Sequence, residues 1–156
     1  MSTPQDQLQW VKASNGSIPE RAIAQGSDTD GQPLYIARAY FKGGLQPGKA
    51  APHLKDGGFV MGWGGRAHPL NEYFVLCGNA SYIRWVPVTG PVKLDEGIRP
   101  VDAGHEAGGE KLFVGRASVG ASMQLGKAGS HLNGGMSYAF GDGERNEKHY
   151  QVLVYA

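Results

Sequence analysis

The stretch GSDTDGQPLYIARA, residues 26–39, decides the fold because the chain contains it twice. Further along, residues 104–117 are GHEAGGEKLFVGRA. In each copy a glycine-rich acidic loop leads into an apolar run that ends on Arg-Ala. A loop-and-strand pattern that recurs within 156 residues indicates a structural unit present in two copies.

Three further blocks recur in the same order as this one. They pair WVKASNGSIPERAI (10–23) with WVPVTGPVKLDEGI (85–98), PGKAAPHL (47–54) with LGKAGSHL (125–132), and EYFVLCG (72–78) with HYQVLVY (149–155). Matched blocks in one order indicate an internal duplication. No linker separates the copies, so we predict two tandem, pseudo-symmetric repeats, residues 8–78 and 82–156, packed around a shared core as one compact unit.

The repeats indicate strands rather than helices. LQWVKA, LYIARAYF, GGFVMGW and EYFVLCG are rich in β-branched or aromatic residues and are bounded by turn-forming residues. LYIARAYF does not alternate strictly between apolar and polar residues, which favours burial on both faces. The helical candidates are one or two turns at residues 19–25, with proline first and glycine beyond the end, and a counterpart near LDEGIR. The sequence therefore predicts an all-β fold with short helical turns only. We also expect Trp10 and Trp85, which open the two repeats, to be largely buried.

Composition excludes several classes of protein. The 25 glycines and 9 prolines indicate many turns, and 40% hydrophobic residues suffice for a core. A net charge of +1 without a basic run argues against nucleic acid as a partner. No stretch approaches the roughly 18 apolar residues of a membrane span. The N-terminus lacks the apolar core of a signal peptide, and Cys77 is alone. We expect a protein that is cytoplasmic or secreted without a signal peptide.

Motifs for catalysis or metal binding are missing from the sequence. There is no Gly-x-Ser-x-Gly elbow, and the five histidines lack zinc-site spacing. Ala50 follows Lys49 where a phosphate loop needs serine or threonine. The acidic stretch SDTDG fails the calcium-loop pattern, because Ala39 stands where the twelfth-position glutamate is required. We therefore expect no catalytic residues, no metal and no cofactor.

Three pairs of polar residues are matched between the copies: Arg38 and Arg116, Lys49 and Lys127, and His53 and His131. For an arginine inside a strand, an ion pair or backbone contact that joins the repeats is favoured over a ligand role. Each lysine follows a glycine in what the pattern indicates is a turn, from which its ammonium would project into a groove. From these residues alone, a plain exposed turn lysine is the favoured interpretation.

In order, the Trp-Val start, Gly-x-Ile-Pro, the acidic loop, the Arg-Ala strand end and Pro-Gly-Lys resemble the DM-nine repeat. This repeat occurs in tandem pairs and in the N-terminal part of natterin-like toxins. The resemblance covers nearly the whole chain after Gln9. It implies two repeats that pack on each other, and a protein that can form a homodimer. Family members of this tandem size include mannose-specific lectins, so the resemblance implies calcium-independent binding of mannose or mannose-rich glycans.

The resemblance also implies particular sugar ligands in the first repeat. In those lectins an aspartate of the acidic loop and the lysine of Pro-Gly-Lys hold the mannose, and these residues match Asp28 and Lys49. A carboxylate accepts hydrogen bonds from two neighbouring hydroxyls, and an ammonium donates to their oxygens. Charged partners make both kinds of bond stronger than neutral ones.

The second repeat keeps Lys127 and carries Glu106 in place of the aspartate. The family's late Gly-Lys-Glu-His turn has become GGRAH at 64–68, whereas GDGER at 141–145 retains Glu144. We expect the two sites to differ, with Asp28–Lys49 binding mannose more tightly because the longer Glu106 loses more side-chain entropy. The alternative is a non-catalytic protein-interaction or toxin-accessory module without useful sugar affinity.

Overall fold

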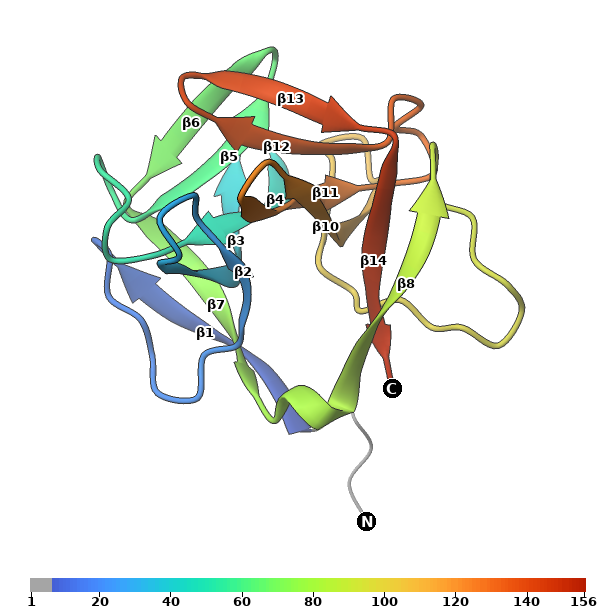
Figure 1. Cartoon of the computed structure of the whole chain (residues 1–156), viewed down its shortest axis with the longest axis horizontal. Coiled ribbons are helices and arrows are strands. Elements are labelled where there is room, and N and C mark those ends of the chain that lie inside the picture. Colours follow the sequence, from blue (N-terminus) through green and yellow to red (C-terminus); the bar gives the residue numbers. More distant parts are fainter. Residues whose placement is uncertain (1–6) are drawn as a thin grey trace.

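The computed structural model describes residues 7–156, which form fourteen β-strands joined by tight turns and longer loops (Figure 1). The first half contains β1 (Leu8–Ser14), β2 (Ala24–Ser27), β3 (Pro33–Phe41), β4 (Gly44–Ala50), β5 (Phe59–Trp63), β6 (Arg66–Leu70) and β7 (Glu72–Gly78). The second half contains β8 (Ile83–Thr89), β9 (Gly104–His105), β10 (Lys111–Val119), β11 (Ser122–Ala128), β12 (Met136–Phe140), β13 (Gly143–Glu147) and β14 (His149–Tyr155). Between Leu8 and Ala156 the 3-10 turn η2 (Ala80–Tyr82) is the one helical element, so the predicted all-β class is confirmed.

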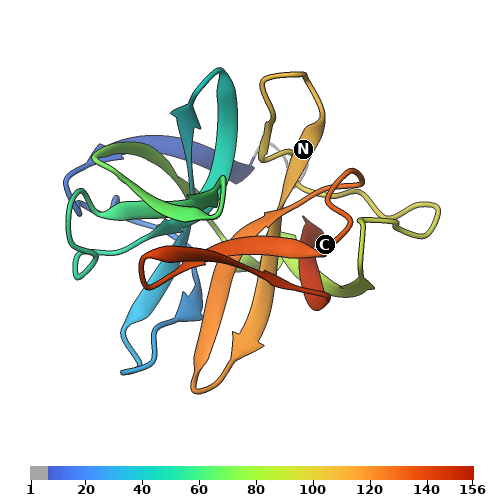
Figure 2. The same ribbon diagram turned by 90° about the horizontal axis from the view of Figure 1, so that it is seen from above.

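The strand pairing repeats itself between the two halves. In the first half β7 lies between β1 and β3, and β3, β4, β5 and β6 follow as antiparallel neighbours. In the second half β14, β8, β10, β11, β12 and β13 pair in the same way. The register is also conserved, since Ile36 pairs with Lys49 as Val114 pairs with Lys127. Seen from above, the two repeats lie side by side (Figure 2).

Two short strands cross from one repeat to the other. Strand β2 pairs with β3 of its own repeat and with β11 of the second, where Ser27 faces Met123. Strand β9 pairs with β10 of its own repeat and with β4 of the first, where His105 faces Leu45. Both acidic loops begin directly after these crossing strands. The topology therefore places each acidic loop beside a strand of the opposite repeat.

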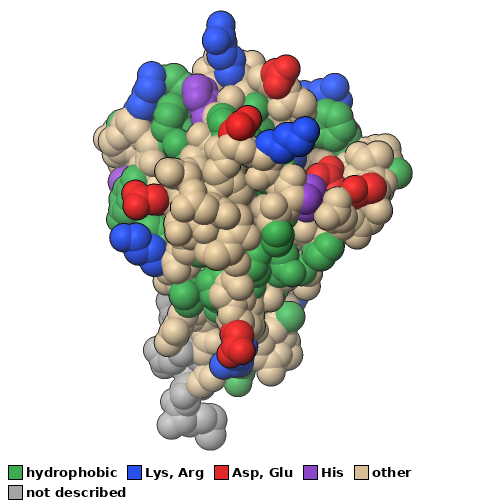
Figure 3. Space-filling model, turned by 90° about the vertical axis from the view of Figure 1, so that its left-hand side faces the viewer, with side chains coloured by type: hydrophobic (Ala, Val, Ile, Leu, Met, Phe, Trp, Pro, Cys, Tyr) green, Lys and Arg blue, Asp and Glu red, His purple; other side chains and the backbone are tan. Residues whose placement is uncertain are grey.

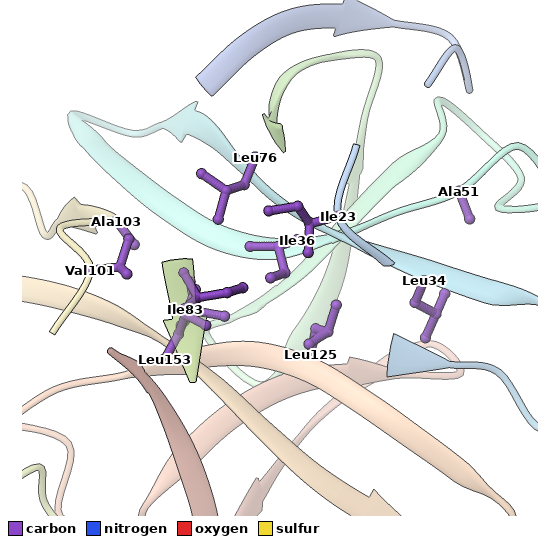
Figure 4. Packing of buried hydrophobic residues seen from close by; sticks show 11 residues of the cluster. Ile23, Leu34, Ile36, Ala51, Leu76, Ile83, Val101, Ala103, Leu125 and Leu153 are labelled. Atoms are coloured by element: carbon purple, nitrogen blue, oxygen red, sulfur yellow. The ribbon is translucent and has the colours of Figure 1, made fainter. Parts of the chain in front are cut away.

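Three groups of buried hydrophobic side chains form the core. One group takes residues from both repeats and lies between them (Figure 4). Its members are Ile23, Leu34, Ile36, Ala51, Leu76, Ile83, Val101, Ala103, Val114, Leu125 and Leu153. The other two groups each draw on one repeat, the first around Phe59 and Tyr73 and the second around Met136 and Tyr138. The two repeats therefore share a core, as the sequence predicts, and each adds a smaller core of its own.

The strand β3 confirms the expected burial on both faces, since Ile36 and its neighbour Ala37 are both fully buried. The helical turn expected at residues 19–25 is wrong. Ala22 forms a β-bridge with Cys77, and the Ile23 N–H donates to the Leu76 carbonyl at 2.9 Å. Burial of Ile23 in the shared core and its bonding to the neighbouring strand outweigh the local helical signal.

The matched tryptophans and arginines form two equivalent contacts at the junction of the repeats. Trp10 and Trp85 are partly buried and pack against the shared core, and a guanidinium covers each ring. Arg38 lies 4.2 Å from the Trp10 ring centre, and Arg116 lies 4.3 Å from that of Trp85. Arg38 donates to the Ala103 carbonyl and Arg116 to the Gln25 carbonyl, each in the opposite repeat. The favoured interpretation of these arginines, a backbone contact that joins the repeats, is confirmed.

The Gly-Lys pairs do not lie in turns. Gly48 and Lys49 are inside β4, and Gly126 and Lys127 are inside β11, with all four side-chain positions buried. A Cβ at Gly126 would lie 2.1 Å from the Ser137 carbonyl oxygen, and one at Gly48 would also meet the neighbouring backbone. These glycines are needed because β5 and β12 pass very close, not because a turn requires an unusual conformation.

Candidate functional site

The first candidate site surrounds Lys49, whose side chain is only 5% exposed. Its Nζ donates to Gln124 Oε1 at 2.6 Å and to the Ala139 carbonyl oxygen at 2.8 Å, both from the second repeat. Asp28, directly after β2, lies beside it, and Asp28 Oδ2 is 2.8 Å from His53 Nε2. These groups line a cavity of about 350 Å³ that is open on one side. The first site is thus built by both repeats.

The second candidate site repeats this arrangement around Lys127, which is 4% exposed. Its Nζ donates to Gln46 Oε1 of the first repeat at 2.7 Å. Glu106 takes the place of Asp28, and its Oε2 is 2.9 Å from His131 Nε2. Gln46 Nε2 also donates to Glu106 Oε1 at 2.8 Å, a contact that the longer glutamate makes possible. The second cavity measures about 340 Å³.

The alternation of side chains along a strand explains why each site needs both repeats. Gln46 and Lys49 stand three residues apart in β4, so they project from opposite faces of the strand. Lys49 therefore enters the site of its own repeat, while Gln46 reaches the site of the other. In β11, Lys127 likewise enters the site of its own repeat, and Gln124 reaches the site of the other repeat. Each of these central strands serves two sites.

Electrostatics in the two sites follow from burial of opposite charges. Burial lowers the pKa of Lys49 to about 8, against the opposing attraction of Asp28. Burial lowers the pKa of Lys127 too, although Glu106 and Glu144 oppose this. For Asp28, burial alone would raise the pKa, but bonds from His53 and the Thr29 N–H, with the charge of Lys49, bring it below its ordinary value. The first site therefore holds a carboxylate and an ammonium together at neutral pH.

The same balance acts on Glu106 in the second site. Burial would raise its pKa, but hydrogen bonds from Gln46 and His131 and the positive charge of Lys127 lower it. An ammonium has three N–H donors. Within residues 7–156 Lys49 Nζ donates two hydrogen bonds and Lys127 Nζ donates one. At least one N–H at each site is therefore left for a ligand. Both sites can therefore donate and accept hydrogen bonds with charged groups.

The predicted site residues fall into two groups in space, as the sequence argument divides them. Asp28 and Lys49 line the first cavity, and Glu106, Lys127 and Glu144 line the second. Their role as sugar ligands stays a prediction. Sequence reasoning did not identify the glutamines as site residues, although the pattern Gln-x-Gly-Lys occurs in both repeats. The sequence pattern matches His53 with His131 but does not pair either histidine with an acidic loop.

The hairpins that close each cavity also come from the opposite repeat. Phe140, at the end of β12, lines the first cavity, and Trp63, at the end of β5, lines the second. Each supplies an aromatic wall beside the polar groups. Within residues 7–156 no cluster of three or more histidine, cysteine, aspartate or glutamate side chains is arranged to hold a metal ion. In the same range no helix has the length and apolar character needed to cross a membrane.

One side of the molecule carries charges of both signs. On the face shown in Figure 3, lysine and arginine side chains alternate with aspartate, glutamate and histidine instead of forming one basic patch. The formal net charge of +1 is therefore spread rather than concentrated on this face.

Comparison with known proteins identifies the family. The DM9 repeat matches residues 1–57 and 47–147, so the chain belongs to the DM9 repeat family, and the resemblance drawn from its motifs is confirmed. This membership suggests a carbohydrate-binding module. No curated protein matches the chain.

Among solved structures, the chain is similar to the nematode sperm cell motility protein MFP2B. The two share 15% sequence identity and superpose with a TM-score of 0.62. The match covers 95% of this chain and 46% of that protein, so the chain spans just under half of its length. At this level of identity the likeness shows a common fold.

Proposed function

We propose that the protein is a calcium-independent lectin that binds mannose or mannose-rich glycans at two equivalent sites, one around Lys49 and one around Lys127. The observation that carries the proposal is the pairing of a carboxylate with a buried lysine in an open cavity, at equivalent places in both repeats. The carboxylate accepts from two adjacent sugar hydroxyls, and the free ammonium N–H donates to a sugar oxygen. The neighbouring aromatic ring offers an apolar face to the ring carbons of the sugar.

The lysines account for binding without a metal. Each buried ammonium supplies a fixed positive charge in its cavity, held in place by a glutamine of the opposite repeat. The sites hold groups suited to hydrogen bonding, and we propose binding rather than catalysis as their role. A glycan array read with and without a chelator tests this: we expect mannose-containing glycans to bind equally in both conditions. No retention of any glycan would favour the protein-interaction alternative.

Removing either charged group of the first site should weaken mannose binding there. We expect Asp28→Ala and Lys49→Ala each to cost about 1.5–3 kcal/mol of binding free energy, the usual range for a hydrogen bond to a charged group. Titration calorimetry with methyl α-mannoside would show the stoichiometry falling from two sites to one at accessible concentrations.

A matched control for these variants stands in the same loop. Asp30 bonds only to Gln32 among the described residues and is exposed, so Asp30→Ala should bind as the wild type does. Unchanged stoichiometry and affinity in both Asp28→Ala and Lys49→Ala would refute the assignment of the first site.

The family resemblance further supports the proposal that two copies of the chain associate. A homodimer would present the sites of both copies to a branched glycan and so raise the apparent affinity without new contacts. Sedimentation velocity at several protein concentrations tests this, and a single monomeric species throughout would count against it.

A further inference from the structure

We infer that the two sites select sugars of opposite charge. The first site takes glycans that carry an acidic group, and the second takes sugars that carry an ammonium group. This inference rests on the proposed lectin function and adds the substrate class of each site. It comes from comparing the two cavities position by position, because the repeated strand register makes equivalent residues identifiable.

The lining of the first cavity has an excess of positive charge. Lys49 and Lys55 both line it, and Asp28 is the single carboxylate among its lining residues. Lys55 lies in the loop after β4, is exposed, and can move its ammonium over the cavity. At the equivalent position of the second repeat stands Asn133, which lines the second cavity and carries no charge.

The lining of the second cavity has an excess of negative charge. Glu106 and Glu144 both line it. Lys127 lines it too and is close enough to both carboxylates for each to raise its pKa. In the strand pair β12–β13 Glu144 faces Ala139, and in the strand pair β5–β6 the equivalent residue is Ala67. The first cavity therefore has no counterpart to this second carboxylate among the described residues.

Glu144 is held in position by one residue of each repeat. Its Oε1 accepts the Gly65 N–H at 2.8 Å, and its Oε2 accepts from the Ser137 hydroxyl. A Cβ at Gly62 would lie 2.7 Å from Glu144 Cγ, so the glycine makes room for this side chain. In the repeat alignment Ala67 stands at the position of Glu144, and Ala139 stands at the position of Gly62, so the first site has neither this glutamate nor this glycine. The glycine that leaves room and the carboxylate that fills it therefore occur together at the second site, and both are missing from the first.

Further substitutions along the same strands increase the polarity of the second cavity. Ser137 and Asn146 pair in β12–β13, whereas Val60 and Pro69 pair at the equivalent place in β5–β6. Each carboxylate oxygen of Glu144 keeps acceptor capacity beyond its present bond. A sugar ammonium would thus meet two carboxylates in the second site, whereas a sugar carboxylate or phosphate would meet two ammonium groups in the first.

The test measures each site alone with a matched set of monosaccharides. Asp28→Ala leaves the second site to be titrated, and Glu106→Ala leaves the first. The probes are methyl α-mannoside, its 6-amino-6-deoxy and 2-amino-2-deoxy analogues, mannuronate and mannose 6-phosphate. One unit of charge at a partly solvated site should change affinity about fivefold to tenfold at low salt. We expect the better amino sugar to exceed both acids at the second site, and the better acid to exceed both amino sugars at the first.

Two variants and a salt series assign the preference to the named charges. Glu144→Gln keeps the size and an acceptor oxygen, and we expect it to lower the ratio of amino-sugar to neutral-sugar affinity at the second site about fivefold. Lys55→Asn, which installs the residue of the second repeat, should lower the ratio of acid to neutral-sugar affinity at the first site. Raising the salt to about 0.5 M should shrink both preferences, because it screens exposed charges.

The outcomes separate this inference from the function on which it rests. If methyl α-mannoside binds but both sites rank the charged probes alike, the charge selection is wrong and the lectin function stands. If the ranking differs but survives Glu144→Gln and Lys55→Asn, these residues are not its cause and the inference is likewise overturned. If neither site binds methyl α-mannoside or any charged probe, both the function and the inference fail.

Discussion

Replacing Leu153 with alanine should lower the free energy of unfolding by about 2–5 kcal/mol, the usual cost of emptying a buried leucine site. Leu153 is fully buried in the core group that both repeats share. The cavity would therefore face side chains of both repeats, and neither can close it alone. We expect urea unfolding followed by circular dichroism and by tryptophan fluorescence to give one coincident transition at lower urea.

The control for this change keeps the volume of the side chain. Leu153→Met should cost less than about 1.5 kcal/mol, since cores tolerate hydrophobic replacements of similar size. Trp10 and Trp85 report on different repeats, so single-tryptophan variants would show whether both unfold together. Two separate transitions, with only the second repeat shifted, would mean that the shared core does not couple the repeats.

Raising the pH from 8 to 10 should stabilise the wild-type protein by about 2–3 kcal/mol relative to Lys49→Met. Burial lowers the pKa of Lys49 to about 8 in the folded protein, from an ordinary value of 10.5. Below pH 8 the lysine is protonated in both states, and the folded state carries the cost of a buried charge. Between the two pKa values the unfolded chain binds more protons, so stability rises with pH.

The same titration should weaken mannose binding at the first site, because the neutral amine no longer supplies the positive charge to the sugar. Stability and affinity would then change in opposite directions over one pH range. Denaturation midpoints and calorimetric affinities at half-unit pH steps provide the measurement, with Lys49→Met cancelling the contributions of Cys77 and the tyrosines. Parallel stability curves for the two proteins would show that Lys49 has an ordinary pKa.

The strands and their duplication could be predicted because their signals are local. The run LYIARAYF is apolar on both faces in sequence and is buried on both faces in the fold. The helical signal at residues 19–25 was equally local, but a long-range contact overrode it when Ile23 entered the shared core. Turn signals for the Gly-Lys pairs failed for the same kind of reason, since close passage of a neighbouring strand demands the same glycine as a turn does.

The candidate site could be predicted only in part. The resemblance supplies Asp28 and Lys49, and the repeat supplies Glu106 and Lys127. Gln124 lies 75 residues from Lys49, so no local pattern brings them together. The packing of β11 against β4, beside the crossing of β2 onto β11, does so. A charged residue can thus be assigned to a site from its motif, whereas its partner from the other repeat requires the topology.

The division of β4 and β11 between two sites has a consequence for the origin of the protein. A single ancestral repeat would hold a lysine for one pocket and a glutamine for another, and could complete neither within one molecule. Such an ancestor would have needed a second copy of itself, and every mutation would then have changed two identical pockets together. Joining the copies into one gene would have freed each pocket to vary while the reciprocal lysine–glutamine contact was kept. The difference between Ala67 in one repeat and Glu144 in the other is the kind of divergence that this freedom allows.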